Sequence, residues 1–141
     1  MANVGEVYFK TDLQFRDGEV GDKLIVLLAE DDFTYIFAKT TSQEKRRDPV
    51  AGCQHQNTDY HSFHIPKGTT RFVKPTWICL NEYYEIFKTG FNASVKADVI
   101  KLHFKIDPCP VLACALSAQG IDATLDQMAA LAASQAKFCT V

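Results

Sequence analysis

The continuous apolar run at residues 24–28, Leu-Ile-Val-Leu-Leu, constrains the fold more than any other segment of the chain. A polar turn of Glu30, Asp31 and Asp32 follows it, and residues 33–41 are rich in the aromatic and β-branched residues typical of strands. The two segments therefore predict a β-hairpin. Because a run that is apolar on both sides must be covered on both faces, we expect this hairpin at the centre of a sheet.

Shorter strands and polar connections are expected on either side of this hairpin. Pro75 belongs at the start of its strand or on an edge, because it has no N–H to donate to a neighbouring strand. The further strands are predicted at residues 4–15, 61–65 and 73–87, the last of these divided at residues 81–82, with turns at residues 17–18 and 21–22 and a long exposed loop at residues 42–60.

The last third of the chain has helical signals. Asp107 and Pro108 form a typical helix start, and Gly120 a typical stop. Asp122 or Thr124 would cap a second helix, in which apolar residues recur at helical spacing. The sequence thus predicts one α+β domain over residues 1–141, with a β unit over about residues 1–87 and two C-terminal helices over about residues 107–137.

Charge and cysteine content limit the classes of function. The formal net charge is −2, so the chain lacks the overall basic character of a dedicated nucleic-acid-binding domain, and any such contact must be local. No apolar run approaches the length of a membrane span. The N-terminal sequence MANVGEVYFK lacks the pattern of a signal peptide, and the cysteines number five, an odd count. We therefore expect free, mostly buried thiols in a reducing cytoplasm.

The order of these segments is similar to that of the MazF/PemK family, the small SH3-like barrel toxins of bacterial toxin–antitoxin pairs. The stretches that carry the resemblance are GDKLIVLL at 21–28, AKTTSQ at 38–43, FHIP at 63–66 and TWICL at 76–80. The resemblance implies a small antiparallel SH3-like β-barrel with C-terminal helices. It also implies a homodimer that acts on single-stranded RNA as an endoribonuclease without a metal or other cofactor, and an antitoxin protein as its partner.

The resemblance also assigns candidate catalytic residues. In the family, an arginine before the first long strand and a threonine at the end of the next one act on the scissile phosphate. The threonine corresponds to Thr40 or Thr41, whereas Lys23 stands at the place of the arginine. Lysine lacks the planar fork of a guanidinium, so Lys23 would serve as a phosphate-binding charge. The alternative is a catalytically inactive barrel that binds a protein partner or nucleic acid.

Two further groups of residues are candidates for RNA binding. The basic triplet Lys45, Arg46 and Arg47 follows the threonine-bearing strand and could contact several phosphates, although acidic residues on both sides cancel much of its field. Tyr83 and Tyr84 could stack on bases, or one of them could belong to the core. Because they are adjacent in a strand, we expect that they cannot both point inward.

Histidines cluster around the middle of the chain. His61 and His64, with His55 nearby, could act as general acid and base, or they could be structural. They could also bind zinc with Cys53, although the spacing matches none of the usual zinc patterns. The odd separation of His61 and His64 predicts that they face opposite sides of their strand.

Overall fold

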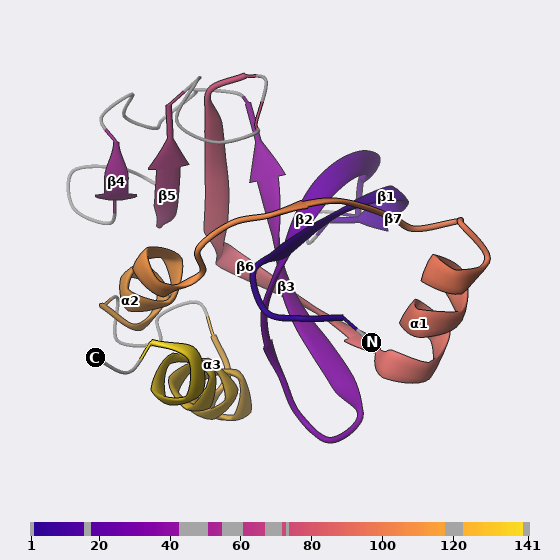
Figure 1. The fold of residues 1–141 in the computed structure, drawn as a ribbon. Coiled ribbons are helices and arrows are strands. Elements are labelled where there is room, and N and C mark those ends of the chain that lie inside the picture. The colour runs from indigo at the N-terminus through magenta and orange to yellow at the C-terminus, as the bar shows by residue number, and fades with distance from the viewer. Residues whose placement is uncertain are drawn as a thin grey trace.

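The computed structural model describes residues 2–15, 18–42, 51–54, 61–66, 72, 74–117 and 123–139. Within these residues the fold is α+β, as predicted: seven antiparallel strands form one sheet, and three helices pack around it (Figure 1). The sheet order is β4-β5-β6-β3-β2-β1-β7, so β4 and β7 are its edges. The elements are β1 (Glu6–Gln14), β2 (Val20–Glu30), β3 (Thr34–Thr41), β4 (Gly52–Gln54), β5 (Ser62–Ile65), β6 (Thr76–Phe87), α1 (Lys88–Lys96), β7 (Lys101–Lys105), α2 (Cys109–Ser117) and α3 (Leu125–Phe138).

The predicted hairpin lies at the centre of the sheet. β2 pairs with β3 through Leu27 opposite Phe37, and both strands have further neighbours on their outer sides. Residues 25–29 are all fully buried, although neighbouring side chains of a strand point to opposite faces. The continuous apolar run is therefore covered on both faces, which confirms the prediction.

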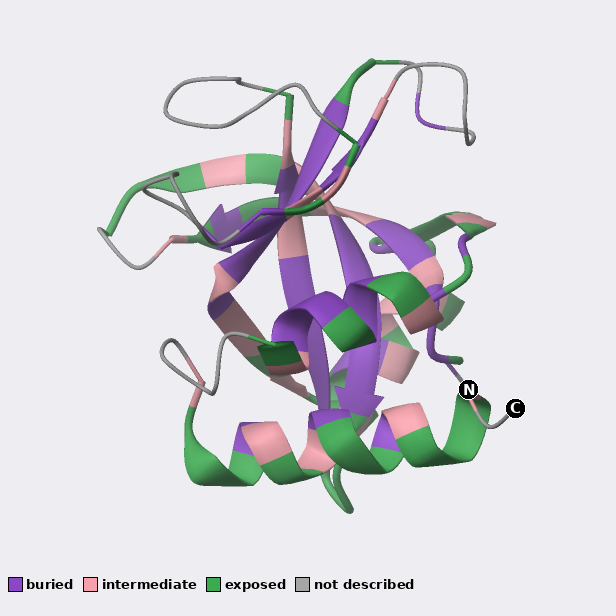
Figure 2. Cartoon of the chain, turned by 90° about the vertical axis from the view of Figure 1, so that its left-hand side faces the viewer, coloured by how far each residue is buried: buried purple, intermediate pink, exposed green. Residues whose placement is uncertain are grey.

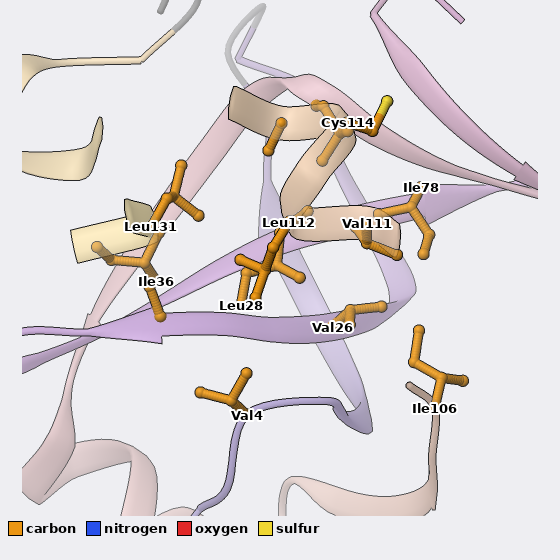
Figure 3. Packing of buried hydrophobic residues seen from close by; sticks show 14 of the residues in the cluster. Val4, Val26, Leu28, Ile36, Ile78, Ile106, Val111, Leu112, Cys114 and Leu131 are labelled. Atoms are coloured by element: carbon orange, nitrogen blue, oxygen red, sulfur yellow. The ribbon is translucent and has the colours of Figure 1, made fainter. Parts of the chain in front are cut away.

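Helices α2 and α3 cover one face. Leu112 of α2 and Leu131 of α3 are fully buried against Val26, Leu28 and Ile36 of the central strands (Figure 3). Figure 2 shows the buried side of these helices turned toward the buried strands, with the opposite side exposed. Burying a leucine of this kind contributes about 2 kcal/mol. This packing holds the C-terminal helices to the sheet.

Helix α1 covers the other face through a single aromatic anchor. The ring of Phe91 lies 5.0 Å from that of Tyr8, 5.4 Å from Tyr35 and 4.9 Å from Phe37, measured between centroids. Burial and the hydrogen bond to Glu6 together raise the pKa of the Tyr8 hydroxyl well above its ordinary range. Neither α1 nor β7 was predicted, because Phe91 is the only fully buried residue of α1 and leaves little helical periodicity.

Three predicted boundaries were wrong. Residues 21–22, expected to form a turn, lie inside β2. Residues 81–82 do not divide two strands but lie within the continuous strand β6, where the pairing with β3 shifts between Ala38 and Thr40. The expected loop at 42–60 contains β4, which pairs with β5. A β-bulge accommodates extra residues within one strand, so the polar residues 81–82 can lie inside β6 and need not form a turn. Pro75, by contrast, directly precedes β6, as predicted.

The starts of the C-terminal helices follow their sequence signals. Asp107 accepts a hydrogen bond from the backbone N–H of Cys109 at 3.0 Å. Thr124 caps α3: its hydroxyl accepts from the N–H of Gln127 at 3.1 Å, and the Gln127 side chain accepts in return from the Thr124 N–H. Thr124 is therefore the cap, and the alternative candidate, Asp122, lies outside the described residues. Reciprocal bonds of this type satisfy two donors that a helix start otherwise leaves open.

The prediction of free thiols was wrong for four of the five cysteines. Cys53 of β4 is bonded to Cys114 of α2, and Cys109 at the start of α2 to Cys139 just after α3. Cys79 is buried and belongs to neither disulfide. The bonded cysteines are 61 and 30 residues apart, and the fold brings them together, so their spacing shows no dense disulfide framework.

Candidate functional site

A cavity of about 250 Å³ opens where β2 begins, β3 ends and β6 begins, and we call it the rim pocket. It brings together three of the residues that the sequence singled out: Lys23, Thr40 and Thr41. Lys74 adds a second cation that the sequence did not indicate. The full lining is Phe9, Asp22, Lys23, Leu24, Thr40, Thr41, Ser42, Phe72, Lys74 and Thr76.

The hydroxyl groups of the rim pocket differ in what they can offer a ligand. Thr40 is buried, and its hydroxyl donates to the carbonyl oxygen of Leu24 at 2.8 Å. Thr76 is also buried and donates to the carbonyl oxygen of Lys74 at 2.9 Å. Thr41 is half-buried and Ser42 is exposed. The hydroxyl groups of Thr41 and Ser42 are therefore the better placed to reach an anion that enters from solvent.

Three lysines lie side by side across β1, β2 and β3, and we call them the lysine row: Lys10, Lys23 and Lys39. Of the three, Lys23 also lines the rim pocket. Lys10 of β1 lies directly opposite Lys23 of β2, so the two side chains share a face of the sheet. Lys39 of β3 lies opposite Ile25, two residues from Lys23, which places it on that face as well. Like charges directly opposite repel each other, so the pairing of Lys10 with Lys23 by itself costs stability.

An aromatic ring lies under the lysine row. The ammonium group of Lys39 is 4.2 Å from the ring centroid of Phe15, and that of Lys23 is 5.9 Å from it. Gly21 allows this arrangement, because a Cβ atom there would lie 2.9 Å from the ring of Phe15. The glycine that the sequence suggested as a turn is needed instead for this close approach.

Asp22, whose carboxylate lines the rim pocket, stabilises the neighbouring backbone. Asp22 accepts a hydrogen bond from the backbone N–H of Asp12 at 3.0 Å. Asp12 has a φ of 55° and lies where the register of β1 shifts between Lys10 and Leu13. Asp22 therefore stabilises the bulge that follows Lys10, and it sets one negative charge against Lys23 and Lys74 in the pocket.

The two histidines lie elsewhere. His61 is buried, and its Nε2 lies 2.8 Å from the carbonyl oxygen of Cys114. His64 is buried, stacks on Trp77 with centroids 4.1 Å apart, and has its Nδ1 3.1 Å from the carbonyl oxygen of Thr76. Neither histidine lines the rim pocket. They have separate partners, as their odd spacing predicts.

The tyrosine pair differs from its prediction. Tyr83 lies opposite Ala38 and packs against the core under α2 and α3, whereas Tyr84 lies opposite Phe37 and packs against the core under α1. Adjacent residues can both pack against a core here, because the sheet is covered on both faces. Both side chains are half-buried.

Sequence reasoning found only part of this site. Lys45, Arg46, Arg47 and His55 lie outside the described residues. Lys10 and Lys39 were missed because each is a single lysine in an otherwise ordinary strand, and only the strand register unites them. Lys74 was missed because nothing local distinguishes it.

A second cavity of about 410 Å³ is mainly apolar and lies between the β4–β5 edge and α2. Ile65, His64, Ile106 and Val111 are among its lining residues. It carries no cluster of lysines, in contrast to the rim pocket.

None of the helices in the described ranges has the length and apolar character needed to cross a membrane. No family model, no curated protein and no solved structure matches the chain.

Proposed function

We propose that this chain binds single-stranded RNA through the rim pocket and the lysine row, as a MazF/PemK-like growth-inhibitor protein. The observation that carries the proposal is the direct opposition of Lys10 and Lys23, with Lys39 beside them over the ring of Phe15. A row of like charges on one face of a sheet attracts a polyanion, which neutralises the repulsion between them. Phosphates at regular spacing are such a polyanion.

The rim pocket supplies the contacts for one phosphate group. In this proposal Lys23 and Lys74 attract the anion, and the hydroxyl groups of Thr41 and Ser42 donate hydrogen bonds to its oxygens. Thr40 shapes the pocket through its bond to Leu24 and does not contact the phosphate. Asp22 at the mouth disfavours a second phosphate and directs the strand toward the lysine row.

Binding is the function that the geometry supports best, and cleavage is the second candidate. His61 and His64, the residues that could move protons, are buried away from the rim pocket. A cleaving form would therefore depend on Thr41 and Lys23. The catalytically inactive alternative, in which the chain binds nucleic acid without cutting it, fits the internal hydrogen bond of Thr40 better.

The wider parts of the family resemblance belong to the same proposal. They are a relationship of this sheet to the SH3-like barrels, a homodimer, a cytoplasmic location and an antitoxin partner. An antitoxin that blocks this site would need an acidic segment complementary to the lysine row. In a reducing cytoplasm the two cysteine pairs would be held as thiols, because disulfides persist mainly in oxidising compartments.

A salt-dependent binding assay tests the proposal. Fluorescence anisotropy with single-stranded RNA should show an affinity that falls with salt, and Lys23→Gln should lower the logarithmic salt slope by about 0.7, the value for one lost phosphate contact. Lys137→Gln, which removes one exposed charge from α3, is the matched control and should leave the slope unchanged. Equal effects of the two substitutions, or no binding at low salt, would contradict the proposal.

The same samples separate binding from cleavage. RNA should remain intact on a denaturing gel while Thr41→Val weakens its binding. Expression of the chain alone should arrest growth if it acts as a growth inhibitor. Cleavage that is lost in Thr41→Val and Lys23→Gln would favour the endoribonuclease over the binding protein.

A further inference from the structure

The two disulfides of this chain have different surroundings. Beside the Cys53–Cys114 bond, His61 completes a group in which one potential ligand atom from each residue lies within 4.8 Å of the others. In the described part of the chain this is the one group of three such side chains, and the Cys109–Cys139 bond has no comparable third member. The ring nitrogen of His61 therefore distinguishes the Cys53–Cys114 pair from the Cys109–Cys139 bond, which only joins the start of α2 to the end of α3.

The spacing of these atoms fits a tetrahedral metal. The Sγ atom of Cys114 lies 3.5 Å from the Nε2 atom of His61. Zinc bonds of about 2.3 Å to sulfur and about 2.0–2.1 Å to nitrogen, at tetrahedral angles, separate two ligands by about 3.6 Å. Cys114 and His61 therefore already have the separation that zinc requires.

The third ligand can adjust. Cys53 is exposed and belongs to β4, an edge strand of three residues, so its sulfur can move away from Cys114 once the bond between them is broken. The hydroxyl oxygen of Ser117 lies 3.7 Å from the Cys53 sulfur on the same side. Because Cys53 is exposed, this side is open to solvent, from which a water molecule can bind as a fourth ligand.

We propose that the reduced form of this chain binds Zn²⁺ through Cys53, Cys114 and His61, with one coordination position open toward solvent. A phosphine or dithiol reductant first converts the disulfide to two thiols and is itself oxidised. Zn²⁺ then binds the two sulfurs, and their two protons pass to solvent. Soft thiolate ligands with an imidazole favour zinc among the common divalent ions.

His61 exchanges one interaction for another in this step. In the disulfide form its Nε2–H donates to the carbonyl oxygen of Cys114 at 2.8 Å, since a carbonyl can only accept. In the zinc form the ring proton resides on Nδ1, and Nε2 gives its lone pair to the metal. The hydrogen bond that is lost is replaced by a coordinate bond, and β4 remains tied to α2 in both forms.

Cobalt spectroscopy tests the site directly. Co²⁺ with thiolate ligands in a tetrahedral site gives intense charge-transfer bands in the near ultraviolet and ligand-field bands in the visible. The test protein is the full chain carrying Cys109→Ser and Cys139→Ser, reduced with a phosphine, so that the Cys53–Cys114 pair supplies the only thiols apart from buried Cys79. One equivalent of Co²⁺ should produce both sets of bands, and one equivalent of Zn²⁺ should remove them.

Co²⁺ binding by two variants and by the oxidised chain tests whether these three residues are the ligands. Cys53→Ser should abolish the charge-transfer bands, and His61→Gln should weaken Co²⁺ affinity at least tenfold while circular dichroism reports an intact fold. The oxidised chain should bind no Co²⁺. Absence of the bands in the reduced, folded protein would overturn the proposal, and so would bands that persist unchanged in both variants.

Discussion

Lys10 of β1 and Lys23 of β2 lie directly opposite each other in the sheet, and Lys39 of β3 shares their face. Opposed like charges cost a few tenths to about 1 kcal/mol relative to a neutral pair. The arrangement places positive charge beside the rim pocket at the expense of stability.

We therefore expect opposite effects of Lys23→Gln on stability and on binding. The free energy of unfolding, measured with urea, should rise by about 0.5 kcal/mol as the repulsion from Lys10 is lost. RNA affinity should fall in the same protein. A double-mutant cycle with Lys10→Gln should show coupling between the two positions, and additive effects would contradict direct opposition.

The substitution Tyr84→Phe tests whether the hydroxyl group of Tyr84 contributes to the stability of the fold. The oxygen is buried and has no hydrogen-bond partner in the described part of the chain. Tyr84→Phe should therefore raise the free energy of unfolding by up to about 1 kcal/mol, because an unsatisfied buried polar group is removed.

Tyr35 provides the matched control for this substitution. Its hydroxyl donates to Asn92 at 3.1 Å and accepts from the N–H of Ala2 at 3.3 Å. Tyr35→Phe should cost about 1 kcal/mol, since it removes satisfied bonds. A loss of stability in Tyr84→Phe equal to that in Tyr35→Phe would show that the Tyr84 hydroxyl has a partner after all.

Asp31 should make the β2–β3 turn sensitive to acid. Its carboxylate accepts bonds from the N–H of Phe33 at 2.9 Å and from the hydroxyl and N–H of Thr34 at 2.8 and 2.7 Å. These bonds, the one from Phe33 first, hold the pKa of Asp31 below its ordinary value. Because the folded pKa is the lower one, the added stability is present above the unfolded pKa and is lost as the pH falls through the folded one.

The variant Asp31→Asn should accordingly be less stable than the parent at neutral pH. We expect a loss of about 0.5–1 kcal/mol, a modest value because the turn is exposed. The difference should disappear in acid, where the parent carboxylate is protonated too. Asp32→Asn at the neighbouring exposed position is the control and should change little; a difference for Asp31→Asn that stays constant across the pH range would refute the turn's role.

Gly5 should tolerate no side chain. Its φ is 95°, and a Cβ atom would lie 2.5 Å from the carbonyl oxygen of Ile106, where the N-terminal segment is held by hydrogen bonds to Leu27 and Ile106. Gly5→Ala should cost about 2 kcal/mol or more through backbone strain and this clash.

Gly90 is the matched control, because it lies in α1 with open space around its Cα atom. Gly90→Ala should stabilise the helix by up to about 1 kcal/mol. Thermal melts of the two variants should therefore shift in opposite directions. Shifts of the same sign would argue against the backbone path described for Gly5.

Local signals sufficed for some elements of the fold. The apolar run at 24–28 required cover on both faces wherever it lay, and Thr124 with Gln127 forms a cap from residues three positions apart. Signals of this kind act over a few residues, so the sequence alone predicted the central hairpin and the start of α3. It also selected Lys23, Thr40 and Thr41, which share the rim pocket.

The tertiary structure decided the rest, because it depends on contacts between distant residues. The register of β1 and β2 places Lys10 opposite Lys23. The bulge in β6 allows one continuous strand where the sequence predicted a turn. The closing of the fold brought Cys114 to Cys53 and His61 across more than fifty residues. Which charges and ligands meet is a property of these long-range pairings, whose free energy comes from burying both faces of one sheet.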